Sequence, residues 1–122
     1  MKVAIATDDG KVVSQDLSTA KFLLVVDLKS PGGRKRELRL KPRRVASPWE
    51  PERRSAEKAL ALEIASRAEG THILVAGGVS LAQREAILES GKRIVLTDRV
   101  FVDDVLESVA KGMLDDHPER AR

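Results

Sequence analysis

The residues best suited to bind a ligand follow three short apolar runs, at the point where each run ends. They are Asp8 and Asp9 after the first run, Gly77 and Gly78 after the second, and Thr97 and Asp98 after the third. Open α/β sheets bind ligands in the crevice beyond the carboxyl ends of their parallel strands. If the three runs are parallel strands, these residues meet in that crevice and form a candidate site.

An anion would suit the glycine turn, because a helix is expected to begin directly after it. Ser80 and Gln83 have the spacing of a capping box. Free N–H groups and the helix dipole then favour negative charge. Asp8 and Asp98 oppose an anion, so they would hold a cation beside it or point away. The alternative is that the aspartates only cap turns and that the glycines only relieve crowding.

A metal-dependent nuclease would need several carboxylates converging on paired divalent ions. Asp8 and Asp98 could supply two of them, and Glu57 is the only suggestion for a third. Because two turn carboxylates are common in α/β proteins, we expect a domain that is not an enzyme.

Positive charge is concentrated between residues 34 and 54, where nine basic and three acidic residues occur in a chain of net charge +3. Such a segment could bind nucleic acid or another polyanion, with Arg34, Arg36, Arg43 and Arg44 as the candidate contacts. The alternative is an arginine-rich hairpin that protects a sheet edge. Single-strand binding proteins usually add aromatic stacking platforms, and Trp49 is the only tryptophan. We expect Trp49 to cover an apolar seam instead.

The pattern of apolar residues predicts five strands and three helices. The strands are expected at residues 2–7, 21–28, 37–40, 73–76 and 94–96. The first helix should begin near Glu52 and end at Gly70, the second should run from Ser80 to Gly91, and the third should bury Phe101, Val105, Val109 and Met113. A meander followed by two crossovers predicts a three-layer α/β/α sandwich with a mixed five-stranded sheet in the order 3-2-1-4-5.

Composition restricts the classes of function. A chain of 122 residues fits one domain, here residues 1–114, with a frayed polar tail at 115–122. No cysteine is present, which excludes thiolate metal sites, and His72 and His117 are the only histidines. No apolar run reaches membrane-spanning length, and the chain starts in a strand pattern without a signal peptide. These features favour a cytoplasmic protein that does not enter the membrane.

The chain resembles the nitrogenase iron–molybdenum cofactor biosynthesis domain family, which includes dinitrogenase accessory factors and has a ribonuclease H-like fold. The resemblance rests on Met1–Gly10, on Ser14 and Ala20, on Ile73–Gly78 and on Val95–Asp98. It covers nearly the whole chain in the same order. It implies an iron–sulfur or iron–molybdenum type cluster as cofactor and other cofactor-assembly proteins as partners.

Two motifs depart from the family pattern. Asp16-Leu17-Ser18 stands where members usually have His-Phe-Gly, and Gly77-Gly78-Val79 stands for Gly-Met-Gly. Iron in such clusters prefers thiolate or imidazole ligands. We therefore predict a carrier-like domain with weak or absent cluster binding, which holds a metal cofactor or an anionic small ligand. Its site would comprise Asp8, Asp9, Asp16, Gly77, Gly78, Ser80, Thr97 and Asp98.

Overall fold

The computed structural model describes residues 2–28, 34–40, 49–68 and 70–121, with Arg34 and Glu50 described in their backbone only. The strands are β1 Lys2–Thr7, β2 Phe22–Asp27, β3 Arg34–Arg39, β4 Ile73–Ala76 and β5 Arg93–Leu96. The helices are α1 Glu50–Arg67, α2 Leu81–Glu89 and α3 Val102–Ala110, and 3₁₀ turns span Leu17–Thr19 and Pro118–Arg120. Each element lies within a few residues of its expected position.

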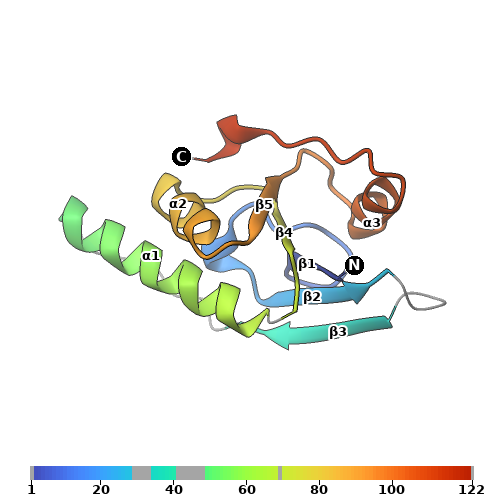
Figure 1. Cartoon of the computed structure of the whole chain (residues 1–122), viewed down its shortest axis with the longest axis horizontal. Coiled ribbons are helices and arrows are strands. Elements are labelled where there is room, and N and C mark those ends of the chain that lie inside the picture. Colours follow the sequence, from blue (N-terminus) through green and yellow to red (C-terminus); the bar gives the residue numbers. More distant parts are fainter. Residues whose placement is uncertain (1, 29–33, 41–48, 69, 122) are drawn as a thin grey trace.

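The sheet has the predicted order β3-β2-β1-β4-β5 (Figure 1). β1 is antiparallel to β2 and parallel to β4, and β4 is parallel to β5. The strand order therefore reverses between β1 and β4: β2 and β3 lie on one side of β1, and β4 and β5 lie on the other. The carboxyl ends of the three parallel strands lie at the same end of the sheet, where the sequence places its candidate site.

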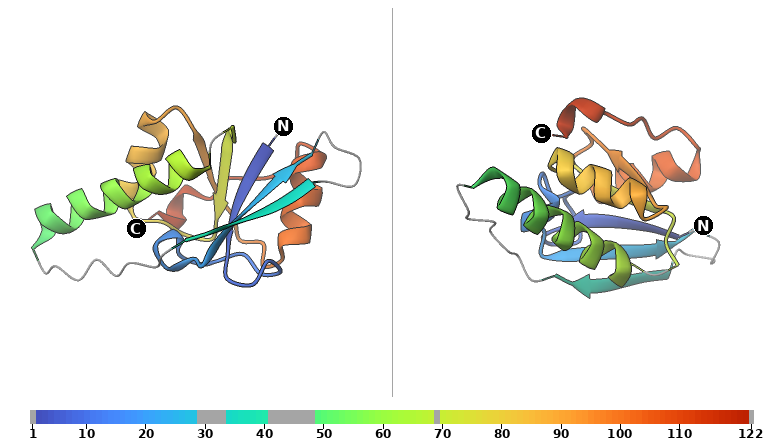
Figure 2. Two further views of the ribbon diagram at one scale, coloured as in Figure 1. Left: turned by 90° about the horizontal axis from the view of Figure 1, so that it is seen from below. Right: turned by 60° about the vertical axis from the view of Figure 1, so that its left-hand side comes forward.

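Helices cover both faces of the sheet, as expected for three layers (Figures 1 and 2). Alternate residues of β1 face opposite layers: Ala4 and Ala6 contact the α1 and α2 side, whereas Val3 and Ile5 contact the α3 side. All four are completely buried. A strand buried on both faces occupies the centre of a sheet, which explains the continuous apolar run in β1.

The ends of the helices differ from the prediction. α1 begins at Glu50 rather than near Glu52, and its first turns are exposed, so Ala56 stays outside the core that begins at Leu60. Trp49 precedes the helix with 65% of its surface exposed. The loop under which the predicted apolar seam would lie is outside the described residues, so that expectation stays a prediction. Among the described residues of α1, burial begins at Leu60.

In α3 the buried apolar residues are Val102, Val105 and Val109, while Phe101, which precedes the helix, and Met113 are exposed. The helix ends at Ala110, so Met113 lies beyond the last turn that contacts the sheet. None of the described helices is long and apolar enough to cross a membrane.

Candidate functional site

A cleft of about 440 Å³ lies where the turn after β4 meets the loop after β1. We call it the switch-point cleft. Its lining combines the glycine turn, the start of α2, the 3₁₀ turn, one residue of α1 and one C-terminal residue: Gln15, Asp16, Ser18, Glu57, Gly77, Gly78, Val79, Ser80, Gln83 and Arg120. Four of the predicted site residues, Asp16, Gly77, Gly78 and Ser80, thus lie together.

The predicted capping box is confirmed at the start of α2. Ser80 Oγ accepts from the Gln83 N–H at 3.1 Å, and Gln83 Oε1 accepts from the Ser80 N–H at 3.1 Å. Gln83 is completely buried, and its Nε2 donates to Ser18 Oγ at 2.6 Å. The amide therefore connects α2 to the 3₁₀ turn and fixes one wall of the cleft.

Gly77 and Gly78 make room for the protein's own chain. The Gly77 N–H donates to Ser14 O at 2.8 Å, and the Leu17 N–H donates to Gly78 O at 3.0 Å. A Cβ on Gly78 would lie 2.5 Å from the Gln15 carbonyl oxygen, and one on Gly77 would lie 2.8 Å from the Ser14 oxygen. The glycines are thus required by a close backbone approach, and their part in binding a ligand stays a prediction.

Asp8 and Asp9 lie outside the cleft lining and serve the turns after β1. Asp8 Oδ1 accepts from the Lys21 N–H at 3.1 Å, and Asp9 Oδ1 accepts from the N–H groups of Val12 and Lys11. These two hydrogen bonds, first that from Val12, hold the pKa of Asp9 below its usual value. This arrangement matches the turn-capping alternative for these residues.

Asp16 caps the 3₁₀ turn, because its Oδ1 accepts from the Ser18 N–H at 3.0 Å. It also lines the cleft, together with the Glu57 carboxylate of α1. Asp16 and Glu57, rather than Asp8 and Asp98, are therefore the carboxylates that a ligand in the cleft would meet.

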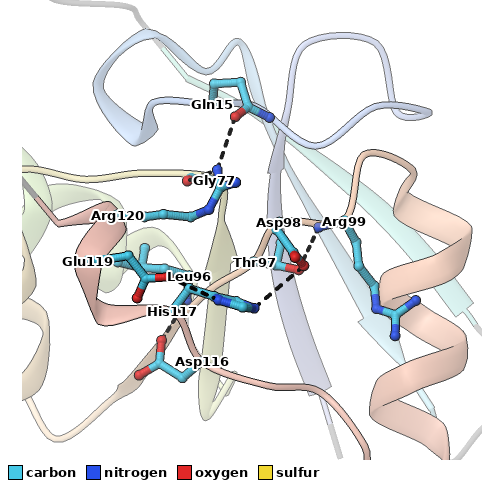
Figure 3. Close-up of polar contacts among 10 residues, drawn as sticks. All are labelled: Gln15, Gly77, Leu96, Thr97, Asp98, Arg99, Asp116, His117, Glu119 and Arg120. Atoms are coloured by element: carbon cyan, nitrogen blue, oxygen red, sulfur yellow. Dashed lines mark hydrogen bonds and ion pairs between the residues drawn. The ribbon is translucent and has the colours of Figure 1, made fainter.

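Thr97 and Asp98 follow β5 but do not reach the cleft lining. Thr97 is buried, and its Oγ1 accepts from the Arg99 N–H at 3.1 Å. Asp98 lies 3.5 Å from Nε2 of His117 (Figure 3). The sequence places the two residues near the correct end of the sheet, but Thr97 serves the following turn and a C-terminal contact occupies Asp98.

The sequence predicts a frayed polar tail at 115–122; in the structure residues 115–121, the C-terminal segment, return to the sheet. Asp116 Oδ1 accepts from the Leu96 N–H at 2.9 Å, and the His117 N–H donates to Leu96 O at 2.8 Å. Farther on, Ala121 forms a parallel bridge with Val79. These pairings use the main chain and one carboxylate of a polar segment, so no hydrophobic pattern in the sequence predicts them.

Arg120 is the positively charged lining residue that the sequence reasoning missed. Its Nη1 donates to Gly77 O at 3.2 Å and to Gln15 Oε1 at 3.4 Å (Figure 3). Next to it, the pKa of Glu119 lies below its usual value, first because its own backbone N–H donates to the carboxylate and then because of His117. Among the described residues that line the cleft, Arg120 alone carries positive charge.

The predicted polyanion contacts fall mostly outside the described residues. Arg43 and Arg44 lie in the segment that the structure does not describe, and Arg34 is described in its backbone only. Arg36 is exposed on β3, which forms one edge of the sheet, together with Lys35 and Arg39. Polyanion binding therefore stays a prediction.

A cluster cofactor does not fit the cleft. Its lining offers two carboxylates, a guanidinium, amides and hydroxyls, but neither thiolate nor imidazole. Over residues 2–28, 34–40, 49–68 and 70–121, no three acidic or histidine side chains are placed to hold a metal ion. The donor set therefore differs from the one that cluster iron prefers.

Comparison with solved structures identifies the fold. A Thermotoga protein provisionally described as a NifB protein matches with a TM-score of 0.68 and 16% identity over 94% of this chain and 91% of that one. The fold is thus that of the group inferred from the sequence. The apo form of the orange protein of Desulfovibrio gigas matches at TM-score 0.67, with 13% identity over 95% and 92% of the two chains.

A protein of Methanocaldococcus jannaschii provisionally described as a dinitrogenase matches at TM-score 0.61, with 17% identity over 96% of this chain and 94% of that chain. No protein-family profile matches the sequence, and no curated protein matches it significantly. The likeness is therefore one of fold, and the ligand must be argued from the cleft.

Proposed function

We propose that this chain is a non-catalytic binding protein that holds a small, oxyanion-bearing molecule in the switch-point cleft. The observation that carries the proposal is the position of Arg120 in the lining beside the start of α2. The first N–H groups of a helix lack intrahelical partners and can bind an anion. A planar guanidinium can donate two parallel hydrogen bonds to the same kind of group. Ser80 and Gln83 both line the cleft, so this helix end opens onto it.

The carboxylates of Asp16 and Glu57 define the other end of the ligand. They line the same cleft as Arg120 and would repel negative charge on the part of a ligand that lies beside them. A molecule with an oxyanion at one end and hydrogen-bond donors or a bound cation at the other would match both ends. The cleft volume of about 440 Å³ lies within the range of small-molecule sites.

Binding without catalysis is favoured over hydrolysis. The nuclease alternative needs Asp8 and Asp98 close to a shared ion, but neither lines the cleft. Asp8 caps a loop N–H, and Asp98 contacts His117. The fold shared with proteins described as NifB and dinitrogenase supports a role in handling a small cofactor or its precursor.

Titration with inorganic phosphate, followed by two-dimensional NMR, tests this proposal. We expect the amide signals of Leu81 and Ala82 to shift, and the affinity to fall at least tenfold in Arg120→Gln. Arg99→Gln is the matched control, because Arg99 extends towards α3, away from Arg120 (Figure 3). Equal affinity in both variants would contradict the proposal. Mass spectrometry of the protein under non-denaturing conditions would identify a ligand that co-purifies.

A further inference from the structure

The C-terminal segment forms part of the wall of the switch-point cleft although it follows the last helix. The chain leaves α3 at Gly112, which has a φ of +67°, and then crosses the carboxyl ends of β5 and β4 (Figures 1 and 3). It reaches the cleft at Arg120 and pairs with Val79 at Ala121.

Polar contacts, rather than buried apolar surface, hold this segment in place. Along it, Asp116 and His117 bond to the Leu96 main chain, while the Val79 N–H lies 3.4 Å from Arg120 O. The side chains of Asp98 and Glu119, on either side of the His117 ring, are 60% and 69% exposed. Each such hydrogen bond contributes only about 1 kcal/mol net to stability.

The core does not depend on the segment for its main apolar contacts. Ala121 is the one residue of the segment that packs against either described core cluster, and it is only partly buried. Regions with few buried apolar contacts open locally at much lower free energy than the core. Detachment of residues 115–121 would therefore leave the sheet and its three helices intact.

We propose that the C-terminal segment is a ligand-operated strap: it detaches to admit the oxyanion, and its closure brings Arg120 onto that group. The inference rests on the proposed function for the identity of the ligand, but local opening can be tested without one. In the closed state Arg120 donates to Gly77 O and Gln15 Oε1. A bound oxyanion would accept further hydrogen bonds from the same guanidinium and would hold the strap closed.

Native-state hydrogen exchange tests the opening in the protein without ligand. The amides of Leu96 and His117 depend on strap contacts, whereas that of Ile5 lies in the central strand. We expect the two strap-dependent amides to exchange at least a hundred times faster than Ile5, and inorganic phosphate to slow them. Exchange of all three at one common rate would overturn the proposal.

An engineered disulfide tests the closure. The chain has no cysteine, so Val79→Cys with Ala121→Cys introduces a single possible pair. Val79 and Ala121 are β-bridge partners, and the Cα atoms of such partners lie within the separation that a disulfide can span. We expect the oxidised variant to take up and release phosphate at least tenfold more slowly than the same protein after reduction. Equal rates in the two forms would overturn the ligand-operated strap.

The two experiments separate the strap from the proposed function. Fast local exchange at His117 without any phosphate binding would support strap opening and contradict the oxyanion site. Phosphate binding with global exchange at His117 would support the site and contradict the strap. Arg120→Gln should combine weaker phosphate binding with faster exchange at His117, because one guanidinium serves both functions.

Discussion

At the residue scale, the Lys92 side chain binds carbonyl oxygens at the C-terminal end of α1. Its Nζ donates to Ala68 O at 3.0 Å and to Thr71 O at 2.7 Å, where α1 has ended and the chain turns into β4. A cation suits this position, because it neutralises the negative end of the helix dipole. The contact joins α1 to the residue that precedes β5.

Replacing Lys92 with Met should lower the free energy of unfolding by about 1–2 kcal/mol, because partly buried carbonyls lose a charged donor. Lys111→Met is the matched control: its ammonium pairs with Glu107, and both side chains are more than half exposed. Such a pair contributes at most about 1 kcal/mol. Urea unfolding measures both variants, and equal losses would show that the Lys92 contacts are not special.

At the element scale, the turn between β4 and α2 depends on two glycines because another loop crosses it. A ligand-binding test that replaces Gly78 would therefore disturb the protein's own packing first. Gly78→Ala should cost about 1–3 kcal/mol of stability, since its Cβ would lie 2.5 Å from the Gln15 oxygen. Gly91→Ala meets no atom within 4 Å and loses only the backbone preference at φ +87°, roughly 1 kcal/mol. Thermal unfolding that ranks Gly91→Ala as the more damaging change would refute this account of the turn.

The edge strand β3 contributes basic residues to the alternative function, which is nucleic-acid or polyanion binding. Lys35, Arg36 and Arg39 are exposed on β3, and in the sequence the basic run continues to Arg44. We expect weak, sequence-independent binding to a nucleic acid oligomer. Its affinity should fall steeply as the salt concentration rises, because the release of counterions from the nucleic acid then contributes less free energy. Replacing Arg34, Arg36, Arg43 and Arg44 with Ser should abolish it, as measured by fluorescence anisotropy. Tight binding at physiological salt would favour a nucleic-acid accessory protein over a small-ligand carrier.

At the scale of the whole molecule, the shared fold comes with a cleft whose lining presents neither thiolate nor imidazole. We expect anaerobic reconstitution with iron and sulfide, followed by iron analysis after desalting, to leave well under one iron per chain. The reason is that the cleft lining holds carboxylates, amides and one guanidinium, where clusters prefer thiolate or imidazole. Stoichiometric, stable iron would mean that residues outside the cleft bind the cofactor.

The sequence by itself determined the layers and the order of the sheet. Continuous apolar runs such as Ile73–Ala76 indicate strands buried on both faces, and the Ser80–Gln83 spacing indicates where α2 begins. These signals are local, because a few neighbouring side chains are enough to show the spacing of apolar residues in one strand or helix and where that element ends. Once strands and helices alternate, handedness and short connections leave few arrangements of the sheet.

Only the tertiary structure decided which candidate residues share a site. Asp8, Asp98 and Gly77 all follow strands, yet the aspartates serve loop contacts while the glycine borders a cleft. Glu57 and Arg120 join that cleft from distant parts of the chain. The C-terminal segment docks through backbone hydrogen bonds and exposed charges, which leave no periodic pattern in a sequence. Long-range pairing of polar segments depends on where the completed sheet presents free N–H and C=O groups, and that arrangement exists only after the chain has folded.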